Sequence, residues 1–133
     1  MTAEKKPKFR KATINACIYG DNRKPKPRPV PAIVIGDWAI HRIITGEPWT
    51  NQNGDYHDGL GFSWTVTHVP TGFKVWNFDH KRQARHFVEG IPGLKLPKLG
   101  NTFGSDTSRS WSESQRNRYH KETARLIKES EGK

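Results

Sequence analysis

The chain of 133 residues has the length of one domain with tails rather than of two domains. Only 32 % of its residues are apolar, so we expect a compact centre with less well packed ends. The five Trp and six Phe, each able to bury about 150–250 Å², argue against full disorder. The formal charge of +10 favours an acidic partner, and no apolar run approaches the roughly 18 residues that span a bilayer.

Cysteine usage and the first residues bear on the compartment. Cys17 is the only cysteine, so no disulfide can form within the chain, and no apolar segment typical of a secretion signal precedes it. We therefore expect an intracellular protein, either cytoplasmic or nucleoid-associated. Cys17 has no neighbouring His or Asp in the sequence and is interpreted as an ordinary small apolar residue.

The charge is concentrated at the N-terminus. Residues 1–28 contain nine Lys or Arg and two acidic residues, a net charge of +7, whereas residues 29–100 carry +1 and residues 101–133 carry +2. Basic residues alternate with proline, most clearly in KPKPRPVP (24–31). Because proline fixes φ and lacks an amide donor, residues 1–31 are predicted to form an extended, exposed basic arm. Within it, ATINACIY (12–19) alternates and is compatible with a short strand that pins the arm to the core.

The centre of the chain predicts an antiparallel sheet. AIVIGDWAIHRIIT (32–45) is rich in Ile and Val, and its break at Gly36-Asp37 predicts two strand segments or one bulged strand. FSWTVTHV (62–69) alternates in polarity, residues 70–72 (Pro-Thr-Gly) supply a turn, and FKVWNF (73–78) returns as the partner strand.

Two helices are predicted after the sheet. Asp79 is a plausible N-cap for the first, and Gly90 and Pro92 are its stop signals. Its apolar stripe consists of Ala84, Phe87, Val88 and Ile91. After a connector (92–109), Ser110-Trp111-Ser112-Glu113 matches a capping box that opens a C-terminal helix within residues 110–133. The weak apolar stripe of that helix predicts loose docking or folding on a partner, beside a basic ridge of Arg118, Lys121, Arg125 and Lys128.

The predicted fold class is therefore α+β. A small antiparallel sheet of three or more strands packs on one helix within residues 32–91, between the basic arm and the C-terminal helix. The stretch WTVTHVPTGFKVWNF (64–78), followed by a helix bearing Gln83-Ala84, resembles the three-stranded-sheet-plus-helix DNA-binding modules of the AP2 and integrase N-terminal type. The resemblance implies an exposed sheet face that enters the major groove, although the strands here carry only Arg42 and Lys74 as fixed positive charges.

The aromatic residues of the centre have two interpretations. Most simply they are the core of a domain that is short of aliphatic residues, and the alternative is a base-stacking platform of the kind found in single-strand binders. The residues concerned are Trp38, Phe62, Trp64, Trp76, Phe78 and Phe87.

The loop TGEPWTNQNGDYHDGLG (45–61) is about as long as structureless loops become in compact domains. Its Trp49 and Tyr56 are candidates for reading bases or contacting a protein, and a flexible insertion is the alternative. The D-Y-H-D run (55–58) matches no metal-ligand spacing, and the chain lacks the thiolates of a structural zinc site, so no metal or other cofactor is predicted. No catalytic motif is present, which favours a non-enzymatic protein.

These observations favour a nucleic-acid-binding protein of modest sequence specificity, with no membrane and no small-molecule substrate. A basic arm can also be only a solubilising or localisation tail. The candidate contacts are Lys5, Lys6, Lys8, Arg10, Lys11, Arg23, Lys24, Lys26, Arg28, Arg42, Trp49, Tyr56, Lys81, Arg82, Arg85, Arg118, Lys121, Arg125 and Lys128. The alternative is a protein-binding accessory or inhibitor, similar to small proteins of phages and mobile elements, that attaches to a host nucleoprotein machine through the arm and the 45–61 loop.

Overall fold

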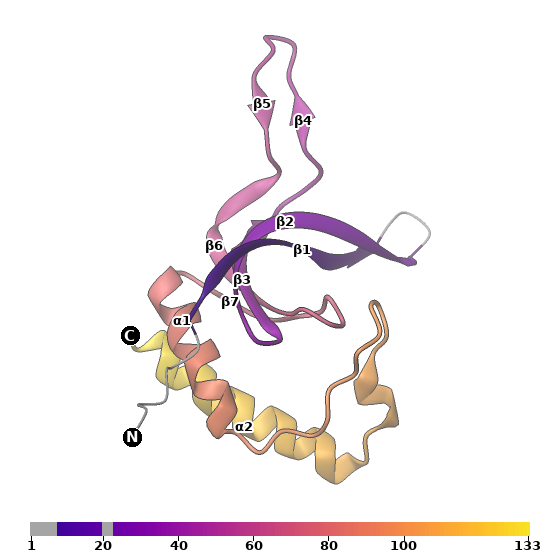
Figure 1. Ribbon diagram of the computed structural model, residues 1–133, viewed down its shortest axis with the longest axis vertical. Helices are drawn as coiled ribbons and strands as arrows, with labels where there is room; N and C mark the ends of the chain where they lie inside the picture. Colours follow the sequence, from indigo (N-terminus) through magenta and orange to yellow (C-terminus); the bar gives the residue numbers. More distant parts are fainter. Residues whose placement is uncertain (1–7, 20–22) are drawn as a thin grey trace, which may run out of the picture.

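The fold is an antiparallel sheet with both helices on one of its sides (Figure 1). The computed structural model describes residues 8–19 and 23–133. The sheet has the order β1-β2-β3-β6-β7. Its strands are β1 (Arg10–Tyr19), β2 (Pro25–Ile35), β3 (Trp38–Ile44), β6 (Leu60–His68) and β7 (Lys74–Phe78). Between β3 and β6, the short strands β4 (Trp49–Thr50) and β5 (Tyr56–His57) pair as a separate hairpin. The α+β class is confirmed, with five strands in the main sheet.

The helices follow the sheet in the sequence. They are α1 (Lys81–Gly90), the 3₁₀ turns η1 (Ile91–Gly93) and η2 (Thr107–Ser110), and α2 (Glu113–Glu131). Among the residues that the structure describes, no helix is long and apolar enough to cross a membrane.

The prediction of an extended, exposed arm is wrong for residues 10–19 and 25–31, which belong to strands of the sheet. β1 pairs with β2 over its whole length, from Arg10 opposite Val34 to Tyr19 opposite Pro25. The short strand expected at 12–19 is confirmed and is longer than predicted. The Cys17 N–H also donates to the Gly72 carbonyl (2.8 Å), so β1 reaches the turn between β6 and β7 and the sheet curls toward closure.

The proline spacing explains how a proline-rich segment enters a sheet. The four prolines of β2 lie at every second position (25, 27, 29 and 31), and Pro27 faces Cys17, whose own N–H points away from β2 to Gly72. All four prolines therefore occupy non-hydrogen-bonded positions of the β1–β2 ladder, where the missing amide removes no bond to β1. β3 pairs with β2 only from Ile33 onward. The amides that the four prolines lack therefore remove no hydrogen bond to β3 either.

Several local predictions are confirmed. The break at Gly36-Asp37 is a turn between two strands, with Gly36 at φ 57°, a conformation that suits glycine. β6 and β7 form the expected hairpin, with Val66 opposite Trp76. The first helix is α1, although His80 rather than Asp79 is its N-cap. Its predicted stripe is buried: Ala84, Phe87, Val88 and Ile91.

Two hydrophobic clusters lie on opposite faces of the sheet, because successive side chains of a strand alternate. One joins the sheet to both helices and is made of Ile40, Val66, Phe78, Ala84, Phe87, Val88, Ile91 and Leu126. The other fills the curl of the first three strands with Ile14, Ala16, Val30, Ala32, Val34 and Ala39. Of the aromatic residues expected in the core, Phe78 and Phe87 are buried with ring centroids 5.5 Å apart, whereas Phe62 is 92 % exposed.

The C-terminal helix docks more firmly than its weak stripe suggests. Leu126 is buried against Gly90 of α1, where an added Cβ would lie 2.8 Å from a Leu126 methyl carbon. Gln83 Nε2 donates to the Glu131 carbonyl (3.0 Å). The predicted capping box at 110–113 is displaced by two residues: the Ser112 hydroxyl accepts from the Gln115 N–H, and the Gln115 amide oxygen accepts from the Ser112 N–H. A capping box accepts glutamine as well as glutamate at its fourth residue, so Ser112 and Gln115 can form the box in place of Ser110 and Glu113.

Candidate nucleic-acid interface

A groove runs between α1 and the first strands of the sheet. It consists of two adjoining clefts of about 550 and 1,000 Å³, which share Ile33 and Lys81 in their walls. The smaller cleft extends over β2 and β3 to Trp64, and the larger one extends between Phe9 and the α1 face that bears Val88. We refer to the two clefts together as the α1 groove.

Cationic side chains that the sequence singled out converge on this groove. They are Lys8, Lys11, Arg42, Lys81 and Arg85. Three acidic residues also line it, namely Asp37, Asp58 and Glu89. Of the five cations, only Arg42 forms an ion pair with a residue that the structure describes, through Asp58 at 3.3 Å. The other four charges are therefore free of acidic neighbours within 4.0 Å in the described chain.

Two of these cations lie over aromatic rings. The Lys81 ammonium is 5.2 Å from the Trp64 ring centroid, and the Arg85 guanidinium carbon is 4.8 Å from that of Phe9. Lys81 and Arg85 are four residues apart on α1, which places both on the same helix face. Trp64 and Phe9 are half-buried, so each ring is partly supported by the protein and partly accessible. Rings alternating with cations along a groove can stack bases and neutralise phosphates.

Arg42 lies in the groove but its donors are already engaged. Its Nε donates to the Gly61 carbonyl (2.9 Å) and its Nη2 to the Leu60 carbonyl (3.1 Å), while Nη1 faces Asp58. Arg28 is bound in a similar way, since its Nη2 donates to the Asp58 carbonyl (2.8 Å). Both arginines therefore fasten the base of the β4–β5 hairpin to the sheet.

The remaining predicted contacts are dispersed over other surfaces. Lys5 and Lys6 lie outside the described residues. Arg10, Arg23, Lys24 and Lys26 are exposed on the β1–β2 hairpin, where Lys26 pairs with Glu47 at 3.3 Å. Arg82 points toward the chain end, with its Nε donating to the Lys133 carbonyl (2.9 Å).

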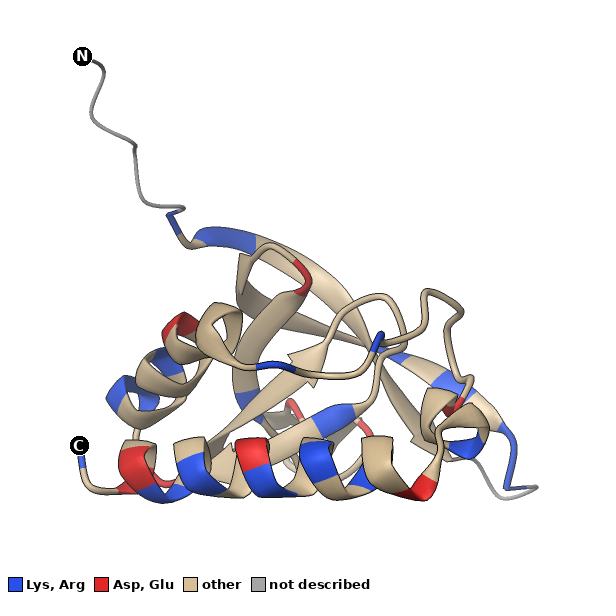
Figure 2. Ribbon diagram, turned by 90° about the horizontal axis from the view of Figure 1, so that it is seen from below, with Lys and Arg blue, Asp and Glu red and all other residues tan. Residues whose placement is uncertain are grey.

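The α2 ridge is exposed but interrupted by acidic residues. Figure 2 shows Lys and Arg alternating with Asp and Glu along this helix. Arg125 forms an ion pair with Glu122 (2.8 Å), while Arg118, Lys121 and Lys128 remain exposed. The ridge is therefore a mixed-charge surface with less positive potential than its cations alone suggest.

Residues 45–61 form a projecting hairpin instead of a structureless loop (Figure 1). The Asn51 amide oxygen accepts from the N–H groups of Asn53 and Asp55 (both 2.9 Å) and closes its turn. Trp49 stacks on His57, with centroids 4.3 Å apart and planes at 13°. Hydrogen-bonding side chains and cross-strand stacking thus give the segment its own order.

The hairpin differs from the α1 groove in charge. Trp49 is 55 % and Tyr56 68 % exposed, but residues 45–61 contain three acidic residues and no Lys or Arg, a net charge of −3. The structure therefore separates the two predicted aromatic contacts from the cations with which they were grouped.

The sequence predicts the two groove aromatics unequally. Phe9 is not among the predicted contacts, although KFRK (8–11) interleaves a ring with cations. Trp64 belongs to the aromatic set for which a core position is the simpler interpretation and a base-stacking platform the alternative. Comparisons with protein-family models, curated proteins and solved structures give no significant match, so the interpretation of the groove depends on its own chemistry.

Proposed function

We propose that this protein is a non-enzymatic nucleic-acid-binding protein that holds a strand in the α1 groove. The observation that carries the proposal is the convergence of Lys8, Lys11, Lys81 and Arg85, none paired with an acid in the described chain, around the rings of Trp64 and Phe9. Cations beside rings bind phosphate and base together, whereas an apolar partner would leave these charges uncompensated and a basic partner would repel them.

The groove favours single-stranded nucleic acid. Its rings lie inside a cleft, so a base must leave a double helix to reach them. Stacking on a ring accepts every base, and lysines recognise phosphate as a point charge. Sequence specificity is accordingly expected to be modest, in agreement with the scarcity of side chains placed for base-edge contacts.

The test compares matched pairs of charges on two helices. Fluorescence anisotropy measures the affinity for single- and double-stranded DNA and RNA of equal length at two salt concentrations. The variant Lys81→Ala/Arg85→Ala removes two groove cations, and Lys121→Ala/Arg125→Ala removes the same two residue types at the same spacing from α2.

We expect the first variant to lower the dependence of log K on log salt by about 1.4, since each phosphate contact to a single strand contributes about 0.7. The control variant should retain most of the wild-type slope. Equal losses in the two variants would contradict a localised interface, and the absence of any binding at low salt would refute the proposal.

A second candidate function is supported by the hairpin. An acidic segment that exposes Trp49 and Tyr56 matches a basic surface on another protein better than it matches nucleic acid. In this alternative the protein is an accessory or inhibitor that attaches to a nucleoprotein machine. A pull-down with and without nuclease tests it: a partner retained after nuclease, and lost in Trp49→Ser/Tyr56→Ser, supports the alternative, while a partner lost after nuclease contradicts it.

A further inference from the structure

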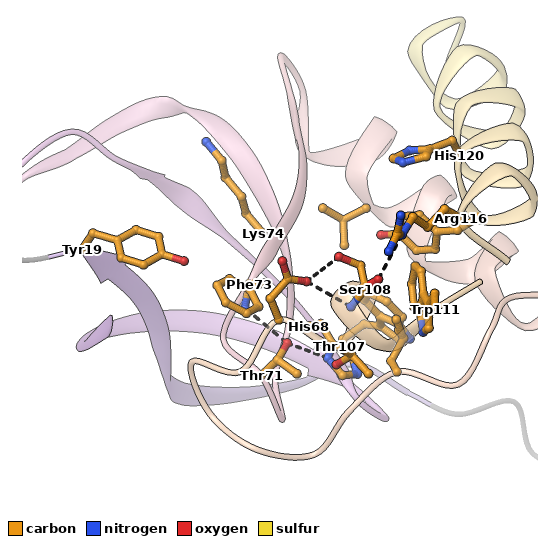
Figure 3. A pocket seen from close by; sticks show the side chains of 15 residues that line it. Tyr19, His68, Thr71, Phe73, Lys74, Thr107, Ser108, Trp111, Arg116 and His120 are labelled. Atoms are coloured by element: carbon orange, nitrogen blue, oxygen red, sulfur yellow. Dashed lines mark hydrogen bonds between the residues drawn. The ribbon is translucent and has the colours of Figure 1, made fainter. Parts of the chain in front are cut away.

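A third cavity, of about 400 Å³, lies where the β6–β7 turn meets the segment before α2 (Figure 3). Trp38 lines both this cavity and the α1 groove, so its ring forms part of the wall between them. The volume is within the range of about 300–1,000 Å³ that is usual for small-molecule sites. None of the predicted nucleic-acid contacts lines it, and the proposed function does not use it.

The cavity has aromatic walls from both sides. Trp38 lies on β3 and Phe73 directly before β7, whereas Trp111 precedes α2 and Tyr119 lies on that helix. The Trp111 and Tyr119 rings touch, with centroids 5.1 Å apart, and Trp111 Nε1 donates to the Lys98 carbonyl (3.2 Å). A ring held by a hydrogen bond and by a neighbouring ring is ordered before a ligand arrives, which lowers the entropic cost of binding a flat molecule.

Two cations line the cavity. Lys74 lies at the start of β7 and Arg116 in the first turn of α2, and Figure 3 shows the Lys74 side chain extending away from Arg116. Arg116 Nε donates to the Ser108 carbonyl (3.2 Å), which fixes the guanidinium and leaves its outer nitrogens unbound within the described chain. The Asp106 carboxylate also lines the cavity, but it accepts from both the N–H (3.0 Å) and the hydroxyl (2.5 Å) of Ser108. Lys74 and Arg116 together outweigh the single carboxylate of Asp106, so the lining has a formal net charge of +1 with its histidines counted as neutral.

His68 adds a ring nitrogen to the cavity lining. Its residue is 6 % exposed, and Nδ1 lies 2.8 Å from the Thr71 hydroxyl oxygen. That oxygen also accepts from the Phe73 N–H (3.4 Å), and the other ring nitrogen of His68, Nε2, has no hydrogen-bond partner among the described residues. Burial lowers the pKa of His68, while Asp37 opposes the shift, and the ring is therefore neutral at pH 7.

We propose that this cavity binds a nucleotide unit, meaning a planar base joined to a phosphate. The base lies between the aromatic walls, the phosphate contacts Arg116 and is reached by the flexible Lys74 side chain, and Nε2 of His68 forms a hydrogen bond with the ligand. A free mononucleotide and the terminal nucleotide of a strand present the same chemistry, and the experiment distinguishes them. The proposal is independent of strand binding in the α1 groove.

The test uses tryptophan fluorescence of the full chain, because Trp38 and Trp111 line the cavity. AMP, adenosine and inorganic phosphate are titrated separately. We expect saturable quenching by AMP, weaker quenching by adenosine and no saturation by phosphate in the same range. Lys74→Ala should weaken AMP about 10-fold, the loss of one charge-assisted hydrogen bond. Lys128→Ala, which removes an exposed lysine of α2 outside the cavity, is the matched control and should bind as wild type.

Three outcomes overturn the proposal: no saturable quenching by AMP, equal affinity for phosphate and AMP, or equal losses in Lys74→Ala and Lys128→Ala. Thermal melts establish that both variants fold. If AMP saturates the site, competition with a short oligonucleotide identifies the source. Displacement of AMP by a strand with a terminal phosphate, but not by the same strand without it, assigns the cavity to strand ends. Lys81→Ala/Arg85→Ala changes two residues of the α1 groove that do not line this cavity, so this variant should bind AMP as the wild type does. Failure of strand binding in the groove and failure of AMP binding in the cavity can therefore be distinguished.

Discussion

The α1 groove and the β4–β5 hairpin both present aromatic rings, yet their charges are opposite. In the groove, Trp64 and Phe9 lie under Lys81 and Arg85, whereas in the hairpin Trp49 stacks on the exposed His57 within a segment of net charge −3. A ring beside a cation suits a base with its phosphate, and a ring among carboxylates suits a basic surface. The formal charge of +10 therefore describes the whole chain and neither of these surfaces.

The two regions are nevertheless connected through one strand. β3 contributes Ile40 to the core below the groove and Arg42 to its wall, and the chain continues from the end of β3 into the hairpin. The difference between the regions thus arises from the side chains and not from separate domains.

The largest effect is expected from the core that supports the groove. Phe87 of α1 is fully buried against Phe78, and Phe87→Ala should lower the free energy of unfolding by about 3–5 kcal/mol through lost contacts and a cavity. Urea denaturation followed by circular dichroism and by tryptophan fluorescence measures it. Coincident transitions would show that groove and hairpin unfold together. A loss below about 1 kcal/mol would contradict the burial of this ring.

Charge reversal separates the regions more directly. Lys81→Glu places a carboxylate over Trp64 and should weaken oligonucleotide binding at low salt by on the order of tenfold or more. Asp55→Lys in the hairpin changes the charge by the same amount in the opposite direction and should leave the affinity within about twofold, since screening removes charge effects beyond about 10 Å. A large gain in Asp55→Lys would mean that the strand extends onto the hairpin.

The sequence predicts the elements whose signals are local. The β6–β7 hairpin follows from alternation around a Pro-Thr-Gly turn, and α1 follows from four apolar residues at helical spacing. Residues 25–31 of β2 are not predicted as a strand, because proline is a general argument against strands, whereas residues 32–35 are. Its period of two places every proline at a non-hydrogen-bonded position, and that regularity is the signal that distinguishes a strand from an extended arm.

The candidate site is predicted less well, because it depends on contacts between distant segments. Lys8 and Lys11 meet Lys81 and Arg85 only through the curl of the sheet, and no spacing within the sequence brings residue 9 beneath residue 85. Composition identified the cations. Their grouping with Trp49 and Tyr56 assumed that exposed rings and charges share one surface, whereas three carboxylates within the loop indicated otherwise.

Acid should destabilise both regions together through β3. His41 is 2 % exposed, and its Nε2 lies 2.7 Å from the Thr67 hydroxyl oxygen. Burial lowers the pKa of His41, an effect opposed by its bond to the Arg42 carbonyl. Because the unfolded chain then binds more protons below about pH 6.5, stability is present above that pH and is lost as the pH falls toward the folded-state pKa. Burial lowers the pKa of His68 in the same direction.

Urea midpoints at pH 7.5 and 5.5 measure this dependence. His41→Gln should reduce the difference between the two midpoints by removing one of the two buried rings, while His57→Gln, which changes an exposed ring of the hairpin, should not. An unchanged difference in His41→Gln would assign the acid sensitivity to other groups.

The smallest effect is expected where the two regions meet. The Asp58 carboxylate of the hairpin faces Arg42 of the groove at 3.3 Å and also accepts from the Leu60 N–H (3.1 Å). Both charged side chains are more than a third exposed, so Asp58→Asn should cost at most about 1 kcal/mol of stability. It also removes a negative charge from the groove wall, and oligonucleotide affinity should therefore rise by about twofold at low salt. Asp55→Asn is the matched control, because it removes the same charge at the hairpin turn, away from the groove. If both variants raised the affinity equally, net charge and not position would govern binding, and the distinction between a basic groove and an acidic hairpin would have no functional meaning.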